Sequence, residues 1–114
     1  MTRALITMPK VARSGEIIEI RTLVQHSMET GYRRDSDGAM LPRDLIRRFT
    51  CHFAASGKPG PGELVFGATL YAAIAANPYL LFHFRATGSG SFTFIWEGDN
   101  GFAHREQTQL IVNG

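Results

Sequence analysis

The sequence predicts an all-β fold, an antiparallel β-sandwich of about seven strands. Short segments in which apolar and polar side chains alternate recur along the chain, as expected of strands with one buried face. Turn-forming residues separate these segments: Asp99-Asn100-Gly101, for example, tolerates the positive φ angles of a tight hairpin. With 114 residues, of which 44% are hydrophobic, the chain can bury the core of one domain, and we expect residues 1–114 to form that single domain.

The first three segments lie in the N-terminal half of the chain. Residues 3–8 and 16–24 have the sequences RALITM and EIIEIRTLV, and residues 44–54 follow after a connection. In the third segment, the alternation places four apolar side chains on one face: Leu45, Phe49, Cys51 and Phe53. Because successive strand residues point to opposite faces, Cys51 and His52 are expected to point away from each other.

Four further segments complete the set: residues 63–70, 79–86, 91–96 and 104–112. Their alternation assigns these apolar side chains to inward positions: Leu64, Phe66, Ala68, Leu70, Leu80, Phe82, Phe84, Ala86, Phe92, Phe94 and Trp96. Tyr79 and Leu81 then point outward with His83, although they are larger and more apolar than a solvated strand face requires. His104, just after the hairpin turn, is expected to be exposed.

Three connections show the residues of turns and loops. Ser36-Asp37-Gly38 is expected to close a loop, and residues 56–63, SGKPGPGE, read as a surface connection. Residues 70–78, LYAAIAANP, are too short for a long helix, so we expect a single helical turn between the sheets there.

Charge and composition exclude several classes of function. The chain has 12 Lys and Arg against 10 Asp and Glu, and within residues 21–48 the arginines are opposed by acids. Nucleic-acid binding needs clustered, unopposed positive charge, so none is expected. No apolar run reaches the roughly 18 residues of a membrane helix, and the first residues, MTRALITMPKVARSG, lack the apolar core of a secretory signal. The single cysteine excludes an internal disulfide.

The sequence predicts no catalytic residues, no cofactor and no metal site. A cupredoxin-type copper site needs a cysteine followed closely by His and Met, but the last methionine, Met40, precedes Cys51. The histidines show none of the paired spacings of a zinc site. A cysteine at an inward strand position is a small, inert core residue rather than a nucleophile. SGKPGPGE also lacks the Lys-Ser/Thr ending of a phosphate-binding loop.

The segment 23–35, LVQHSMETGYRRD, begins at the end of a strand, where connections often carry function. Two interpretations remain open. In the first, Met28 closes the end of the core. Glu29 then pairs with Arg33 or Arg34, a surface ion pair worth at most about 1 kcal/mol. In the second, the segment is a docking surface, for which an adaptable methionine, an aromatic ring and guanidinium groups are suitable.

Eight residues are therefore candidates for partner binding. Six lie in the segment 23–35: His26, Met28, Glu29, Tyr32, Arg33 and Arg34. The outward residues Tyr79 and Leu81 form a second candidate surface.

Three blocks of the sequence carry a resemblance to a known family. They are LVQHSMETGYRRDSDGAMLPRDLIRRFTC, YAAIAANPYLLFHFRA and FTFIWEGDNGF, and in this order they resemble the SoxZ family of bacterial sulfur oxidation. The similarity runs from about residue 5 to residue 112. Ser27 departs from the family pattern, which has proline there, and this change should loosen the loop because proline fixes φ.

This resemblance implies an immunoglobulin-like β-sandwich that is not an enzyme. SoxZ-like proteins pair with SoxY, whose mobile C-terminal arm ends in a Gly-Gly-Cys-Gly-Gly type motif, and the cysteine carries the sulfur intermediate from enzyme to enzyme. The present chain ends in LIVNG, so the carrier thiol is expected on a SoxY-like partner. The resemblance also implies transient contacts with Sox enzymes and a periplasmic location, reached together with exported SoxY. The isolated chain is also a candidate for self-association.

Two other classes of function stay open at this point. One is a metal-binding redox protein built around His26, Met28 and His83. The other is a free-standing fibronectin-like interaction module. A neighbouring gene for a short protein that ends in Gly-Gly-Cys-Gly-Gly would favour the carrier subunit over both.

Overall fold

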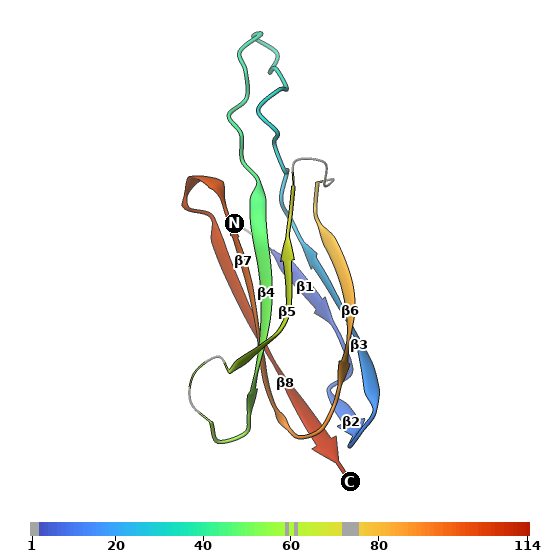
Figure 1. The fold of residues 1–114 in the computed structure, drawn as a ribbon. Coiled ribbons are helices and arrows are strands. Elements are labelled where there is room, and N and C mark those ends of the chain that lie inside the picture. The colour runs from blue at the N-terminus through green and yellow to red at the C-terminus, as the bar shows by residue number, and fades with distance from the viewer. Residues whose placement is uncertain (1–2, 59, 61, 72–75) are drawn as a thin grey trace.

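The computed structural model describes residues 3–58, 60, 62–71 and 76–114 and confirms the expected class, an immunoglobulin-like β-sandwich (Figure 1). Within these residues, strands form two sheets, and one 3-10 turn, η1 (Asp99–Gly101), joins the last two strands. The strands are β1 (Ala4–Thr7), β2 (Val11–Arg13), β3 (Ile17–Val24), β4 (Ile46–Ala55), β5 (Glu63–Thr69), β6 (Tyr79–Arg85), β7 (Gly90–Gly98) and β8 (Ala103–Asn113).

The strands divide into a three-stranded sheet, in the order β1-β3-β6, and a five-stranded sheet, in the order β2-β8-β7-β4-β5. Neighbouring strands are antiparallel except β2 and β8, which run parallel. The sequence did not predict β2, because three residues are too few for alternation to be visible. Between β1 and β2 the chain passes from one sheet to the other at Pro9, which has no N–H to continue a strand ladder.

Aromatic side chains between the sheets form the centre of the core. Phe66 of β5 and Phe82 of β6 stack across the sheets, with ring centroids 4.2 Å apart and planes inclined by 3°. Phe49 of β4 also reaches Phe82 across the sheets at 6.2 Å, and it lies 5.1 Å from Trp96 of its own sheet. Aromatic pairs add about 0.5–1.5 kcal/mol each to the free energy of burial. This layer therefore fixes how the two sheets face each other.

The predicted alternation is wrong at Leu64, which is 56% exposed instead of inward. Across β4 and β5, Cys51 faces Phe66, whereas the next residue, His52, faces Leu64. The extra residue in β5 is a β-bulge, and it turns Leu64 to the outer side of the sheet.

Three other expectations can be compared with the structure. His104 was expected to be exposed, but its ring lies 5.7 Å from the ring of Trp96 and its Nε2 lies 2.9 Å from Glu106 Oε1. The described residues within 56–63 are exposed, as predicted for a surface connection. The single helical turn was predicted within residues 70–78, and residues 72–75 of this segment lie outside the described residues.

Residues 25–45, which join β3 to β4, project beyond the end of the sandwich as a long hairpin-like segment, here called the arm (Figure 1). The molecule measures 60 × 24 × 22 Å, so it is strongly elongated. The turn η1 lies at the same end of the sandwich as the arm (Figure 1). This end therefore combines the base of the arm with the turn between β7 and β8.

Candidate functional site

The two sides of the arm run antiparallel and are joined by backbone hydrogen bonds. Near the base, the N–H of Glu29 donates to the carbonyl of Asp44 at 2.9 Å, and the N–H of Asp44 donates back to Glu29 at 2.8 Å. Further out, the N–H of Leu41 donates to the carbonyl of Arg33 at 2.8 Å. The arm is therefore a narrow ribbon whose order depends on contacts at its tip and its base.

The tip of the arm is closed by the side chain of Asp35. Its Oδ1 accepts hydrogen bonds from the N–H groups of Asp37 at 2.9 Å and Ala39 at 3.0 Å. Arg34 Nη1 donates to the carbonyl of Gly38 at 2.7 Å, and Gly38 has a φ of 82°, which glycine adopts without strain. The structure thus confirms the loop closure predicted at Ser36-Asp37-Gly38 and adds the Asx turn that holds it.

Met28 anchors the base of the arm to the core. Its side chain is buried in the core cluster, and its Sδ accepts a hydrogen bond from the N–H of Ile46 at 3.3 Å. Its φ of 54° is uncommon for a residue other than glycine, and its N–H donates to Nδ1 of His26 at 2.9 Å. Met28 therefore closes the end of the core, as the first interpretation predicted.

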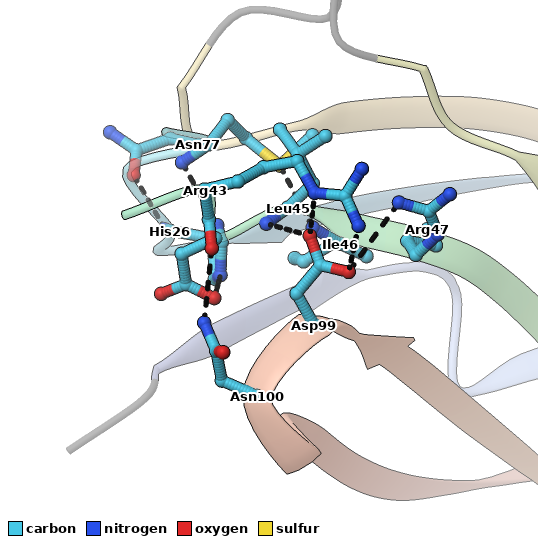
Figure 2. Close-up of polar contacts among 10 residues, drawn as sticks. His26, Arg43, Leu45, Ile46, Arg47, Asn77, Asp99 and Asn100 are labelled. Atoms are coloured by element: carbon cyan, nitrogen blue, oxygen red, sulfur yellow. Dashed lines mark hydrogen bonds and ion pairs between the residues drawn. The ribbon is translucent and has the colours of Figure 1, made fainter. Parts of the chain in front are cut away.

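His26 joins the base of the arm to the connection between β5 and β6 (Figure 2). Its N–H donates to Asn77 Oδ1 at 2.9 Å, and the N–H of Asn77 donates to the His26 carbonyl at 2.6 Å. Its ring meets the ring of Phe102 edge-on at 4.8 Å. Because Nδ1 accepts the hydrogen bond from Met28, the neutral ring carries its proton on Nε2, 3.6 Å from Asp44 Oδ1.

Asp99, the first residue of η1, is the centre of a polar cluster at the base of the arm (Figure 2). Its Oδ2 accepts a hydrogen bond from the N–H of Leu45 at 3.1 Å and lies 3.0 Å from Arg43 Nε. Its Oδ1 lies 3.4 Å from Arg47 Nη1. Partial desolvation acts to raise the pKa of Asp99, but the Leu45 N–H and the two guanidinium groups have the larger combined effect and hold that pKa below its usual range.

Asn100 adds a second link between η1 and the arm. Its Nδ2 donates to the carbonyl of Arg43 at 3.1 Å (Figure 2). The turn between β7 and β8 is therefore bonded to the arm through side chains of two successive residues. Met28 attaches the base of the arm to the core, His26 attaches it to Asn77, and these contacts attach it to η1.

Of the other candidate residues of the segment 23–35, Tyr32, Arg33 and Arg34 lie on the outer part of the arm, whereas Glu29 lies near its base. Tyr32 is 82% exposed. Arg33 Nη2 lies 2.5 Å from Glu29 Oε1, and this hydrogen bond lowers the pKa of Glu29. Arg34 is exposed apart from its bond to the tip. The segment thus divides into a buried base and an exposed outer part.

Tyr79 and Leu81 belong to a different surface, because both are exposed on the outer face of the three-stranded sheet. The structure does not bring them together with the outer part of the arm. Sequence reasoning missed the residues that hold the base: Arg43, Arg47, Asn77, Asp99 and Asn100. Their partners lie about fifty residues away along the chain, so no local pattern could have identified them.

The structure also describes the surroundings of the only thiol. Cys51 lies on β4 with its side chain in the core, and burial raises the pKa of its thiol to about 12. Among the described residues, no group of three or more His, Cys, Asp or Glu side chains could hold a metal ion. The same part of the chain has no helix that is long and apolar enough to cross a membrane.

Fold and site together define an immunoglobulin-like β-sandwich that holds a projecting arm on a rigid base. The chain belongs to the SoxZ family, because the family model described as "Sulphur oxidation protein SoxZ" matches residues 6–109. Membership of this family implies a role in the Sox sulfur-oxidation system and a partnership with SoxY. Members of the family are generally non-catalytic subunits of a carrier complex.

Solved structures with a similar fold include superoxide reductases and a sulfur carrier protein. Superoxide reductase (neelaredoxin) from Ignicoccus hospitalis is 16% identical, with a TM-score of 0.74 over 98% of this chain and 82% of that chain. The sulfur carrier protein SoxY from Chlorobium limicola f thiosulfatophilum is 10% identical, with a TM-score of 0.65 over 97% of this chain and 79% of that chain. At these identities the likeness shows the fold alone. No curated protein matches the sequence.

Replacing Asp99 by Asn should remove an acid-sensitive contribution to stability. Because the pKa of Asp99 is lower in the folded protein than the ordinary 3.8, its charge stabilises the fold above that value, and the contribution is lost as the pH falls through the lower folded pKa. Urea unfolding from about pH 6 to about pH 2.5 measures this effect. The free energy of unfolding of the wild type should fall more steeply at the acid end than that of Asp99→Asn. The matched control Asp37→Asn, at the arm tip, should behave like the wild type, and equal slopes for wild type and Asp99→Asn would contradict the expectation.

Native Cys51 should resist thiol reagents. With a thiol pKa of about 12, only about one molecule in ten thousand carries a thiolate at about pH 8, and the side chain is also shielded from the reagent. Titration with a chromogenic disulfide should detect almost no thiol in the folded protein and one thiol per chain in guanidinium chloride. Rapid labelling of the folded protein would show that Cys51 is accessible after all.

Proposed function

We propose that this chain is the non-catalytic subunit of a SoxYZ-type sulfur carrier. In this role it binds a SoxY-like protein and supports the presentation of a cysteine-bound sulfur intermediate to Sox enzymes during thiosulfate oxidation. The observation that carries the proposal is the family match over residues 6–109, on a chain that has the expected sandwich fold.

The position of Cys51 supports the assignment of the carrier thiol to the partner. A carrier cysteine must be exposed so that enzymes can reach it, and it must ionise near neutral pH to act as a nucleophile. Cys51 does neither, because it is buried between the sheets and its thiol pKa is raised to about 12. In this proposal the sulfur intermediate is bound to a cysteine near the C-terminus of the SoxY-like protein.

The outer part of the arm is the proposed surface for presenting the intermediate. Tyr32, Arg33 and Arg34 are exposed there, whereas Met28 and His26 fix the base. A surface that is held at its base costs less conformational entropy when it docks. Guanidinium groups also bind planar or tetrahedral oxyanions through paired donors, which suits an anionic thiosulfonate or sulfonate on the partner.

The proposed compartment is the periplasm, which the chain would reach together with its SoxY-like partner. The contacts with Sox enzymes are proposed to be transient, because a carrier must leave one enzyme to reach the next. A net charge of +2 gives only modest long-range steering to such encounters.

Co-expression with a SoxY-like protein, encoded by a gene next to the gene of this chain, tests the proposal directly. We expect a one-to-one complex by size-exclusion chromatography with light scattering, and intact mass should locate sulfur adducts on the partner. We expect the complex to persist at micromolar concentration, because interfaces of standard size, roughly 1,200–2,000 Å² in total, bind with dissociation constants of about micromolar or lower. Two separate peaks at that concentration would overturn the proposed function.

A second variant tests the role of the arm. Tyr32→Ala removes a ring that is 82% exposed, so stability should change by less than about 0.5 kcal/mol. We expect thiosulfate oxidation by the reconstituted Sox system to slow several-fold, or the complex with the SoxY-like protein to weaken. Ile111→Ala, an exposed apolar residue of β8, is the control and should leave both measurements unchanged. If Tyr32→Ala also leaves both unchanged, the arm is not a docking surface.

A further inference from the structure

The outer face of the three-stranded sheet carries a row of large apolar side chains. Leu5 of β1, Leu23 of β3 and Tyr79 of β6 are paired in register across the three strands. They are 62%, 39% and 54% exposed, and Leu81, two residues after Tyr79 on the same face, is 42% exposed. These four residues are here called the apolar row. The solvated face of an antiparallel sheet normally carries polar side chains at such positions.

The core does not need these side chains. The alternate positions of the same strands already supply buried residues, such as Ile20 and Val24 of β3 and Phe82 of β6. Leu23 and Leu81 therefore contribute little to folding while they face solvent. Their position is explained if another surface covers them.

The surface around the apolar row is hollowed. A groove of about 630 Å³ lies at the seam between β1 and β8, with Leu5, Leu23 and Glu106 in its lining. A smaller hollow of about 160 Å³ lies between Leu5, Leu23 and Tyr79. Leu5 and Leu23 line both, so the two hollows form one continuous surface at the end of the sandwich from which the arm projects.

The charges on this face are largely neutralised locally. Arg21, between Leu23 and Glu19 on β3, lies 2.5 Å from Glu19 Oε1. Glu19 Oε2 lies 3.9 Å from His83 Nε2 on β6. The apolar row is thus bordered by the Arg21–Glu19 ion pair and the polar side chain of His83, the pattern of an interface with an apolar centre and a polar rim.

We propose that the SoxY-like partner docks on this face, with the apolar row at the centre of the contact and the β1–β8 groove at its margin. The inference rests on the proposed function and adds which surface of this chain, and which of its residues, contact the partner. SoxY from Chlorobium limicola f thiosulfatophilum has a similar fold, with a TM-score of 0.65 over 97% of this chain. A partner of this fold offers a twisted sheet face of its own, and two such faces pack well against each other at about 10 Å.

The area available supports the inclusion of the groove. Three strands about 4.8 Å apart and up to eight residues long, at about 3.3 Å per residue, cover roughly 400 Å² in plan. A stable complex buries about 800 Å² on each partner. The sheet face alone is therefore too small, and the contact must extend over the β1–β8 groove and toward the base of the arm.

The test uses two variants on the apolar row and one matched control. Leu23→Glu and Leu81→Glu each replace an apolar side chain of the row by a carboxylate that would lose its water when the partner docks, which is unfavourable. Arg21 lies opposite Leu81 in register, so the second variant should fold well. Leu64→Glu makes the same change at a residue that is 56% exposed on the other sheet. Thermal unfolding of all three variants checks that each is folded.

We expect Leu23→Glu and Leu81→Glu to weaken the complex with the SoxY-like protein at least about 30-fold by calorimetry, and Leu64→Glu to bind like the wild type. If the wild type binds and both variants bind equally well, this face is not the docking surface, although the proposed function stands. The same holds if Leu64→Glu loses as much affinity as the other two. If the wild type does not bind, the proposed function fails and this inference fails with it.

The oligomeric state of the isolated chain provides a second measurement. If the chain alone forms a dimer that Leu23→Glu dissociates, while the partner still binds this variant with wild-type affinity, the face serves a second copy of the chain. That result would overturn the assignment to the SoxY-like partner.

Discussion

Aromatic stacking between the two sheets is the contact on which the rest of the structure depends. Phe66 and Phe82 join the edge strands β5 and β6, and Phe49 connects this pair to Trp96. The layer sets the spacing of the sheets, and at one end the buried side chain of Met28 completes the core. Because Met28 also lies at the base of the arm, the packing of the core determines where the arm leaves the sandwich. The base of the arm is therefore fixed as firmly as the close-packed core to which it is attached.

The strands could be predicted from the sequence because alternation is a local signal that the burial of one sheet face imposes. The prediction failed where a contact distant in sequence controls the backbone. At Leu64 a bulge opposite Cys51 and His52 reverses the alternation. Strand β2 forms through its pairing with the edge of β8, which is distant in sequence. The sequence left two interpretations of Met28 open, and its burial agrees with the one in which it closes the end of the core. The cluster around Asp99 could not be predicted, because Arg43 of the arm and Arg47 of β4 lie more than fifty residues before Asp99 in the sequence.

The same sandwich occurs in superoxide reductases and in SoxY, so the fold by itself does not specify an activity. In this chain the side chains of Asp99 and His26 make their polar contacts at the base of the arm. The four histidines lie on separate elements: one is at the base of the arm, and the others are on β4, β6 and β8. These polar contacts therefore fix the shape of a surface rather than build a catalytic centre, which agrees with membership of a family of carrier subunits.

The burial of Cys51 also has a consequence for chemistry on a neighbouring chain. Sulfur bound to a cysteine is lost when a thiolate attacks it, and the rate of that exchange depends on the access and ionisation of the attacking thiol. Cys51 lies between the sheets, and its thiol stays protonated far above neutral pH. It is therefore no acceptor in thiol–disulfide exchange. A partner that carries sulfur on its own cysteine can stay in permanent contact with this subunit without losing its cargo to it.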